Sequence, residues 1–215
     1  MKGTNSFHTK NIVTTGRKIE EAEKALIMLH GRGANAEDIL SLSQYLSVKD
    51  FALLAPQATN HTWYPFSFMA PISQNEPWLS SALSLVSQIV ADVKQSGVIN
   101  ENIFFLGFSQ GACLTLEFVT RNATQYGGIA AFTGGLIGDN IHMENYKGNF
   151  NNTPVFIGSS DPDPHVPVQR VLETTSILKN MKANVTEKIY RNMGHTISKE
   201  EIDLANKLIF LDNFS

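Results

Sequence analysis

The chain has 215 residues, of which 42% are hydrophobic and 17% charged, and its formal net charge is -3. These values are typical of a soluble globular protein, so we expect residues 1–215 to form a single domain with one core. The slight negative charge gives no basic surface for nucleic acid, and no run of about 18 apolar residues predicts a membrane span.

Short apolar runs alternate with segments of helical periodicity along the chain. Buried strands are predicted in six places: residues 25–30, 51–55, 103–107, 128–132, 154–158 and 185–190. The first five lack a clean alternation of apolar and polar residues, which indicates burial on both faces of a sheet. A further strand, antiparallel and at the sheet edge, is expected around residues 11–15.

Helices are expected in five places: residues 36–47, 78–96, 110–122, 167–181 and 199–213. Asn35 and Asp38 stand where the first helix would have its cap and the reciprocal partner of that cap. Because strands alternate with helices, the sequence predicts a mostly parallel central sheet covered by helices on both faces. Residues 56–77 form a long segment rich in aromatic residues and proline, which indicates either a functional loop or unrecognised elements.

The main chemical pattern lies at residues 107–111, which read Gly-Phe-Ser-Gln-Gly and match G-x-S-x-G. The pattern directly follows a predicted strand and directly precedes a predicted helix. A nucleophile on such a sharp turn adopts a strained backbone, and the flanking glycines remove side chains that would collide. We therefore interpret Ser109 as a catalytic nucleophile, with an ordinary serine cap on a glycine-rich turn as the alternative.

A serine hydroxyl needs a base, and with a nucleophile on this kind of turn the chain order is nucleophile, acid, histidine. Three of the six histidines precede Ser109, and His142 lies in a polar stretch without positional logic. His165 follows the candidate acids too closely to bridge from an acid to the serine. His195 remains as the expected base, on a loop between the last predicted strand and the last predicted helix.

The acid is expected on the loop after the fifth of the six predicted strands, where two aspartates compete. Either Asp161 or Asp163 could accept a hydrogen bond from the histidine ring and stabilise the imidazolium. The tetrahedral intermediate also needs backbone N–H donors that form an oxyanion hole. One donor is expected from Gln110, directly after the nucleophile, and the second from Arg32, on the loop after the strand at residues 25–30.

Cys113 lies four residues after Ser109, one helical turn deeper, and is expected to be a buried apolar residue rather than a second nucleophile. It is the only cysteine, so no disulfide within the chain is possible. The opening residues lack the apolar run of a secretory signal, so we expect a cytoplasmic protein. No spacing typical of metal ligands is found, so we expect no metal site.

Motifs at four places match those of one known family: LHGRGAN at residues 29–35, GFSQGA at 107–112, DPHVP at 163–167 and GHTIS at 194–198. As a set they resemble the phospholipase/carboxylesterase group of α/β-hydrolases, which includes acyl-protein thioesterases and small bacterial carboxylesterases. The resemblance implies an α/β-hydrolase fold with a mostly parallel central sheet, helices on both faces and no separate lid domain. It also favours Asp163 over Asp161, since the family pattern D-P-x-V-P places the catalytic acid first.

The resemblance further implies hydrolysis of a small-molecule ester or thioester without a cofactor. Ser109 would attack the acyl carbonyl, the alcohol or thiol would leave with a proton from His195, and water would hydrolyse the acyl-enzyme. Relatives include dimers, so a homodimer is compatible with the sequence. The alternatives are dienelactone-hydrolase-like or peptidase activity, or a hydrolase-shaped binding protein without useful turnover.

In thioesterases of this family, loops over the site hold an acyl chain. An apolar wall of that kind is expected from Trp63, Tyr64 and Phe66, together with Phe68 and Met69. The equal alternative is a hydrophobic loop that packs into the core.

Overall fold

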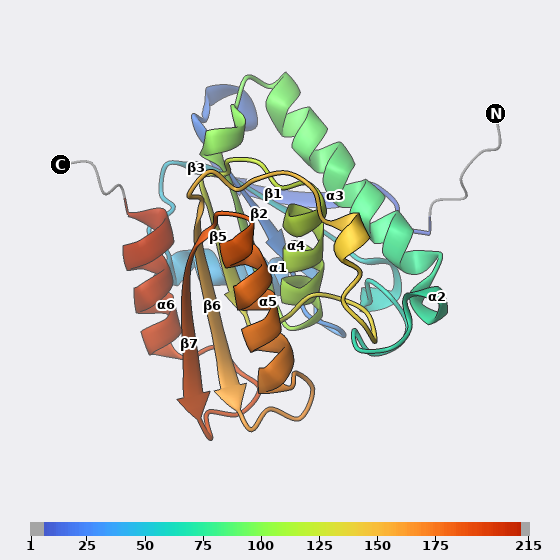
Figure 1. Ribbon diagram of the computed structural model, residues 1–215. Helices are drawn as coiled ribbons and strands as arrows, with labels where there is room; N and C mark the ends of the chain where they lie inside the picture. Colours follow the sequence, from blue (N-terminus) through green and yellow to red (C-terminus); the bar gives the residue numbers. More distant parts are fainter. Residues whose placement is uncertain (1–6, 212–215) are drawn as a thin grey trace.

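A seven-stranded sheet lies at the centre of the computed structural model, which describes residues 7–211 (Figure 1). Along the chain the strands are β1 (Ile12–Gly16), β2 (Lys24–Leu29), β3 (Phe51–Pro56), β4 (Ile103–Phe108), β5 (Gly128–Phe132), β6 (Pro154–Asp161) and β7 (Asn184–Arg191). Across the sheet their order is β1-β3-β2-β4-β5-β6-β7. β1 runs antiparallel to β3, and all other neighbouring strands are parallel.

The six predicted strands and the predicted edge strand are all confirmed, with small shifts of their ends. The largest extension is in β6, which continues to Asp161 instead of ending at Gly158. The reason is its pairing with β7, which runs as far as Asp161 opposite Arg191. Main-chain hydrogen bonds with β7 therefore keep residues 159–161 in the strand, although the apolar part of the sequence ends at Gly158.

Helices cover both faces of the sheet (Figure 1). One face packs against α3 (Trp78–Gln95), α4 (Gln110–Arg121) and α5 (Val168–Asn180), and the other against α1 (Ala36–Leu40) and α6 (Lys199–Ala205). Successive strand residues alternate between the two apolar cores, so that Ile27 of β2 joins the first and Met28 the second. This burial on both faces explains why the strands lack a clean alternation of apolar and polar residues.

The first predicted helix is shorter in the structure. It ends at Leu40 and continues as a 3-10 turn, Ser41–Tyr45. There the Ser41 hydroxyl donates a hydrogen bond to the Asp38 carbonyl at 2.6 Å, and such local side-chain bonds compete with a regular helix. The predicted start is confirmed, because Asn35 and Asp38 form a reciprocal capping box.

The last predicted helix, residues 199–213, changes type after Ala205. Residues Asn206–Phe210 form a π-turn, and the Asn206 side chain donates to the Tyr45 carbonyl at 2.8 Å. This contact with the end of the 3-10 turn that follows α1 accompanies the wider turn. Residues 212–213 of the predicted helix lie outside the described residues.

The loops after β2, β3, β4, β6 and β7 share one edge of the sheet, because these strands run in the same direction. In open α/β sheets, ligands bind outside the carboxyl ends of the strands. The long segment at residues 56–77 starts at this edge and contains two short turns, Thr59–His61 and Ile72–Asn75 (α2). The sheet therefore brings every predicted site residue to the same edge.

Candidate active site

Ser109 occupies a sharp turn between β4 and α4. Its backbone angles are φ 55° and ψ -118°, in a region that side-chain-bearing residues rarely adopt. Two backbone hydrogen bonds hold it there: its N–H donates to the Phe132 carbonyl at 2.9 Å, and its carbonyl accepts from the Cys113 N–H at 3.0 Å. The strained turn fixes where the hydroxyl points.

The glycines on either side of Ser109 allow this turn to pack closely. A Cβ atom on Gly107 would collide with the Gly111 carbonyl, and one on Gly111 would collide with the Leu29 carbonyl at the end of β2. The start of α4 therefore approaches the strand ends at backbone distance. The G-x-S-x-G pattern is thus explained by sterics at both glycines.

His195 lies on the loop between β7 and α6, and its Nε2 is 2.8 Å from Ser109 Oγ. Its Nδ1 is 2.9 Å from Asp163 Oδ2. Because an ionised carboxylate only accepts hydrogen bonds, Nδ1 carries the proton and Nε2 accepts one from the serine hydroxyl. The three residues predicted as nucleophile, base and acid therefore form one hydrogen-bonded row.

The Asp163 side chain is fully buried and held by the backbone of its own loop. Its Oδ1 accepts hydrogen bonds from the His165 and Val166 N–H groups, both at 2.8 Å. Burial by itself would raise the pKa of Asp163, but these bonds and the one with His195 lower that pKa below its ordinary value. The carboxylate therefore stays charged beside the imidazole.

Asp161, the competing candidate acid, is exposed at the end of β6. Its backbone carbonyl accepts a hydrogen bond from the Asn192 N–H at 3.0 Å, which closes the β6–β7 pairing. Asp163, and not Asp161, contacts His195.

Ser160 joins the loop of the acid to the loop of the base. Its side chain is buried, accepts a hydrogen bond from the Gly194 N–H at 3.0 Å and donates one to the Pro162 carbonyl at 3.1 Å. Gly194 directly precedes His195, and Pro162 directly precedes Asp163. No motif in the sequence singles out Ser160, because its role depends on two loops that meet only in the folded sheet.

Two rings contact His195 on its flanks. The Phe108 ring centroid lies 5.3 Å from that of His195, and the His165 ring lies edge-on at 4.8 Å. His165 is thus a cavity residue beside the base, although it does not bond Ser109. Its position next to the acid in DPHVP was the available signal for this placement.

The two predicted oxyanion donors come from backbone close to Ser109. Gln110 is the first residue of α4, so its N–H has no acceptor within the helix and lies at the positive end of the helix dipole. Gly31, which precedes Arg32, lies against the nucleophile, since a Cβ built on it would be 3.5 Å from Ser109 Cβ. Both N–H groups therefore belong to backbone that borders Ser109.

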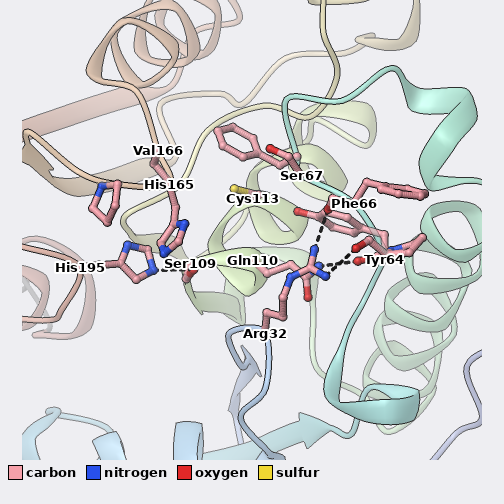
Figure 2. A pocket seen from close by; sticks show the side chains of 13 residues that line it. Arg32, Tyr64, Phe66, Ser67, Ser109, Gln110, Cys113, His165, Val166 and His195 are labelled. Carbon is pink, nitrogen blue, oxygen red and sulfur yellow. Dashed lines mark hydrogen bonds between the residues drawn. The ribbon is translucent and has the colours of Figure 1, made fainter.

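A cavity of about 540 Å³ opens beside Ser109 (Figure 2). Its lining comes from the loop after β2, the segment after β3, the start of α4, and the loops of the acid and the base. The lining residues are Arg32, Tyr64, Pro65, Phe66, Ser67, Phe68, Ser109, Gln110, Cys113, Pro164, His165, Val166 and His195. The hydrogen-bonded row of Ser109, His195 and Asp163 thus faces a space large enough for a small molecule.

The predicted apolar wall is present in part. Tyr64, Phe66 and Phe68 line the cavity. Trp63 does not, and its prediction as a substrate-binding residue is corrected: the side chain is fully buried in the core, and its indole N–H donates to the His30 carbonyl at 2.8 Å. Met69 also packs against the core and is not part of the lining.

Two side chains at the site fasten this wall through its backbone. The Gln110 side chain accepts from the Trp63 N–H at 2.9 Å and donates to the Tyr64 carbonyl at 2.8 Å. The Arg32 guanidinium donates to the carbonyls of Pro65 and Phe66 at 2.7 and 2.6 Å (Figure 2). Arg32 therefore holds the wall in place, a role the sequence did not indicate.

Two buried histidines, His8 and His30, form hydrogen bonds with the backbone of residues 58–63 in the same segment. His8 Nε2 donates to the Trp63 carbonyl at 2.9 Å, and its Nδ1 accepts from the Thr59 N–H at 3.2 Å. His30 Nε2 accepts from the Ala58 N–H at 3.1 Å. Burial lowers the pKa of both rings below the ordinary value, which keeps both histidines neutral and able to accept these bonds.

Within residues 7–211, no three or more His, Cys, Asp or Glu side chains are grouped so that they could hold a metal ion. In the same part of the chain, no helix combines the length and apolar character needed to cross a membrane.

Comparison with known proteins gives a consistent result. A family model described as Phospholipase/Carboxylesterase matches residues 10–212. A crystal structure of a phospholipase/carboxylesterase from Dyadobacter fermentans is 55% identical in sequence, with a TM-score of 0.94, and the match covers 95% of this chain and 98% of that one.

Two curated yeast proteins are also similar. Acyl-protein thioesterase 1 of Saccharomyces cerevisiae is 28% identical over 223 residues, covering 91% of this chain and 96% of that protein. Acyl-protein thioesterase 1 of Kluyveromyces lactis is 26% identical over 212 residues, covering 89% and 93%. The similarity therefore extends over nearly the full length of these relatives.

Proposed function

Because this chain belongs to the phospholipase/carboxylesterase family, we propose that it hydrolyses small carboxylic esters or thioesters through an acyl-enzyme formed on Ser109. The chain is a carboxylic ester hydrolase, and the α/β-hydrolase fold expected from its sequence is confirmed. Residues 7–211 contain a mostly parallel sheet with helices on both faces and no separate lid domain.

The observation that carries the proposal is the row of hydrogen bonds from Ser109 through His195 to Asp163. The two distances, 2.8 Å and 2.9 Å, lie within the range in which a base takes a proton from a nucleophile. The charged Asp163 fixes the tautomer that leaves Nε2 free to accept this proton.

In the first half of the reaction, Ser109 Oγ attacks the acyl carbonyl carbon while His195 Nε2 takes the hydroxyl proton. The C=O bond becomes a single bond, and its oxygen acquires negative charge. The N–H groups of Gln110 and Arg32 stabilise this oxyanion, and each such donor contributes a few kcal/mol to the transition state. The intermediate collapses as the alcohol or thiol leaves with the proton from His195.

In the second half, water attacks the acyl group on Ser109 while His195 takes a proton from that water. The proton then returns to Ser109 Oγ as the carboxylic acid is released. Because an ester and a thioester differ only in the leaving atom, the same groups serve both. The names of the yeast relatives, acyl-protein thioesterase 1, support the inclusion of thioesters. We also propose that the reaction takes place in the cytoplasm.

The test uses a fluorophosphonate probe, which forms a covalent bond with an activated serine, together with hydrolysis of p-nitrophenyl butyrate and butyryl-CoA. We expect the wild-type protein to be labelled and active, Ser109→Ala to be neither, and Ser84→Ala, on the exposed face of α3, to match the wild type. Labelling or turnover that survives Ser109→Ala would overturn the proposal.

The same test includes an enol-lactone and a peptide amide. Faster turnover of either than of all esters and thioesters would point to a dienelactone-hydrolase-like or peptidase activity instead.

A further inference from the structure

Two buried polar groups in the wall of the cavity beside Ser109 lie next to each other. They are the hydroxyl of Tyr64 and the thiol of Cys113, whose residues are 0% and 1% exposed and both line the cavity. Cys113 lies one helical turn after Ser109, and the two side chains interact with each other. Figure 2 shows them beside the same space that Ser109 faces.

The Tyr64 hydroxyl has no hydrogen-bond partner of normal geometry among the described residues. The group beside it, the Cys113 thiol, is only a weak partner. Burial raises the pKa of Tyr64 well above its ordinary value and that of Cys113 to about 12, so both groups keep their protons. Tyr64 therefore offers a buried donor whose neighbour, the Cys113 thiol, is only a weak acceptor, and buried donors without a strong partner are rare in folded proteins.

Glu117, a buried carboxylate on α4, does not accept a hydrogen bond from the Tyr64 hydroxyl. Glu117 accepts hydrogen bonds from the Tyr146 hydroxyl at 2.9 Å, from the Ile137 N–H at 3.0 Å and from Arg121 Nε at 2.7 Å. Its oxygens are thus occupied by groups outside the cavity.

The position of Tyr64 is fixed by its backbone. Its carbonyl accepts hydrogen bonds from Gln110 Nε2 at 2.8 Å and from the Thr62 hydroxyl at 3.0 Å. A donor held in this way can select a substrate, because little motion is lost when the bond forms.

The side of Ser109 on which Tyr64 lies indicates which part of the substrate it meets. His195 must protonate the leaving group, so the leaving group lies on the His195 side. Figure 2 shows His195 and His165 on one side of Ser109 and Tyr64 on the other. The acyl group therefore extends toward Tyr64.

We propose that the Tyr64 hydroxyl donates a hydrogen bond to an acceptor atom within the acyl group, so that the enzyme prefers oxygen-bearing acyl groups, such as ethers, ketones or hydroxy acids, over alkyl groups of equal length. This inference rests on the proposed function, since it concerns the acyl group that Ser109 receives. It names Tyr64 as a specificity-determining residue.

The experiment compares pairs of p-nitrophenyl esters that differ by one CH2-to-oxygen replacement: methoxyacetate with butyrate, 3-methoxypropanoate with pentanoate, and 4-methoxybutanoate with hexanoate. The ratio of kcat/KM within each pair is measured for the wild type and for Tyr64→Phe. Because the oxygen changes the intrinsic reactivity of the ester equally for both proteins, the change in ratio reports the enzyme alone. Tyr126→Phe is the control, since its hydroxyl bonds the Asn122 carbonyl outside the cavity.

We expect Tyr64→Phe to lower the oxygen-to-alkyl ratio about three- to tenfold for at least one pair, while Tyr126→Phe leaves all three ratios unchanged. Thermal unfolding checks that Tyr64→Phe is folded. If Tyr64→Phe left the kcat/KM ratio of every pair unchanged, even with a lower kcat/KM for both esters of a pair, the inference would be overturned and the proposed function would stay intact. A wild-type protein that hydrolyses none of these esters, nor butyryl-CoA, would instead overturn the proposed function.

Discussion

The Ser160 hydroxyl accepts a hydrogen bond from the Gly194 N–H at 3.0 Å, so the strand that leads to the acid also holds the turn that leads to the base. With its second bond, to the Pro162 carbonyl, Ser160 sets the spacing of the two loops. The Asp163–His195 distance of 2.9 Å depends on that spacing. We therefore expect Ser160 to act as a positioning residue for Asp163 and His195.

Replacing Ser160 with alanine should lower kcat about tenfold, with a smaller change in KM. The reason is that a more mobile His195 would be less well aligned with Ser109, whereas contacts with the substrate would be retained. The pH profile of kcat/KM should change as well, since the hydrogen bond between Asp163 and His195 would be weakened. Ser159→Ala is a matched control, because the neighbouring Ser159 hydroxyl is buried and has no hydrogen-bond partner within residues 7–211. Equal effects of the two substitutions on kcat and on the pH profile would argue against the positioning role.

Asp163→Asn should lower kcat about 10^3- to 10^4-fold, because an amide favours the wrong tautomer of His195 and cannot balance an imidazolium. Asp161→Asn should leave kcat within about twofold, as expected for an exposed surface change. Steady-state hydrolysis of p-nitrophenyl butyrate measures both. If Asp161→Asn were the more damaging substitution, the assignment of the acid would be wrong.

Gln110→Ala separates the backbone and side-chain roles of this residue. The oxyanion N–H is retained, but the wall at Trp63 and Tyr64 loses its amide anchor. We expect KM to rise about tenfold and kcat to fall less, because each lost buried hydrogen bond costs about 1 kcal/mol or more of wall stability. A loss confined to kcat would show instead that the side chain acts on the oxyanion hole.

Cys113 should resist alkylation in the native protein. Its thiol is buried and its pKa is raised to about 12, so almost no thiolate is present at pH 8. We expect iodoacetamide to react slowly with the folded protein and quickly in 6 M guanidinium chloride, as followed by mass spectrometry. Rapid alkylation of the folded protein, accompanied by loss of activity, would mean that Cys113 is accessible and reactive.

Acid should weaken the fold through His30. Burial lowers the pKa of His30, so below about pH 6.5 the unfolded chain binds a proton that the folded chain excludes. The contribution of neutral His30 to the free energy of unfolding is therefore fully present above this pH. It is lost as the pH falls through the lower pKa that His30 has in the folded state. Urea unfolding at pH 7, 6 and 5 should show a steeper decline for the wild type than for His30→Gln, which does not titrate. If the free energy of unfolding fell equally with pH in both proteins, His30 would not contribute to the loss of stability in acid.

The sequence predicts the chemical groups better than their surroundings. Ser109 and His195 stand beside strands and helices that could be recognised, so their meeting follows from the order of a parallel sheet. The residues alone left Asp161 and Asp163 open as the acid, and only the family resemblance favoured Asp163, which contacts His195. Ser160 and the side chain of Arg32 act across loops that are distant in sequence, and no periodicity reports such contacts. Trp63 shows the same limit, because an aromatic residue in a loop carries no signal of which way it faces.

The segment that carries Tyr64, Phe66 and Phe68 is anchored at several points through its main chain, while the side chains of Tyr64 and Phe68 are buried in the core. His8, Arg32 and Gln110 bind its carbonyl and N–H groups rather than its cavity-facing side chains. Phe66 is exposed, so its side chain can be replaced while the main-chain hydrogen bonds keep the wall in register with Ser109. A change of substrate preference made at Phe66 would therefore require no change in these anchors.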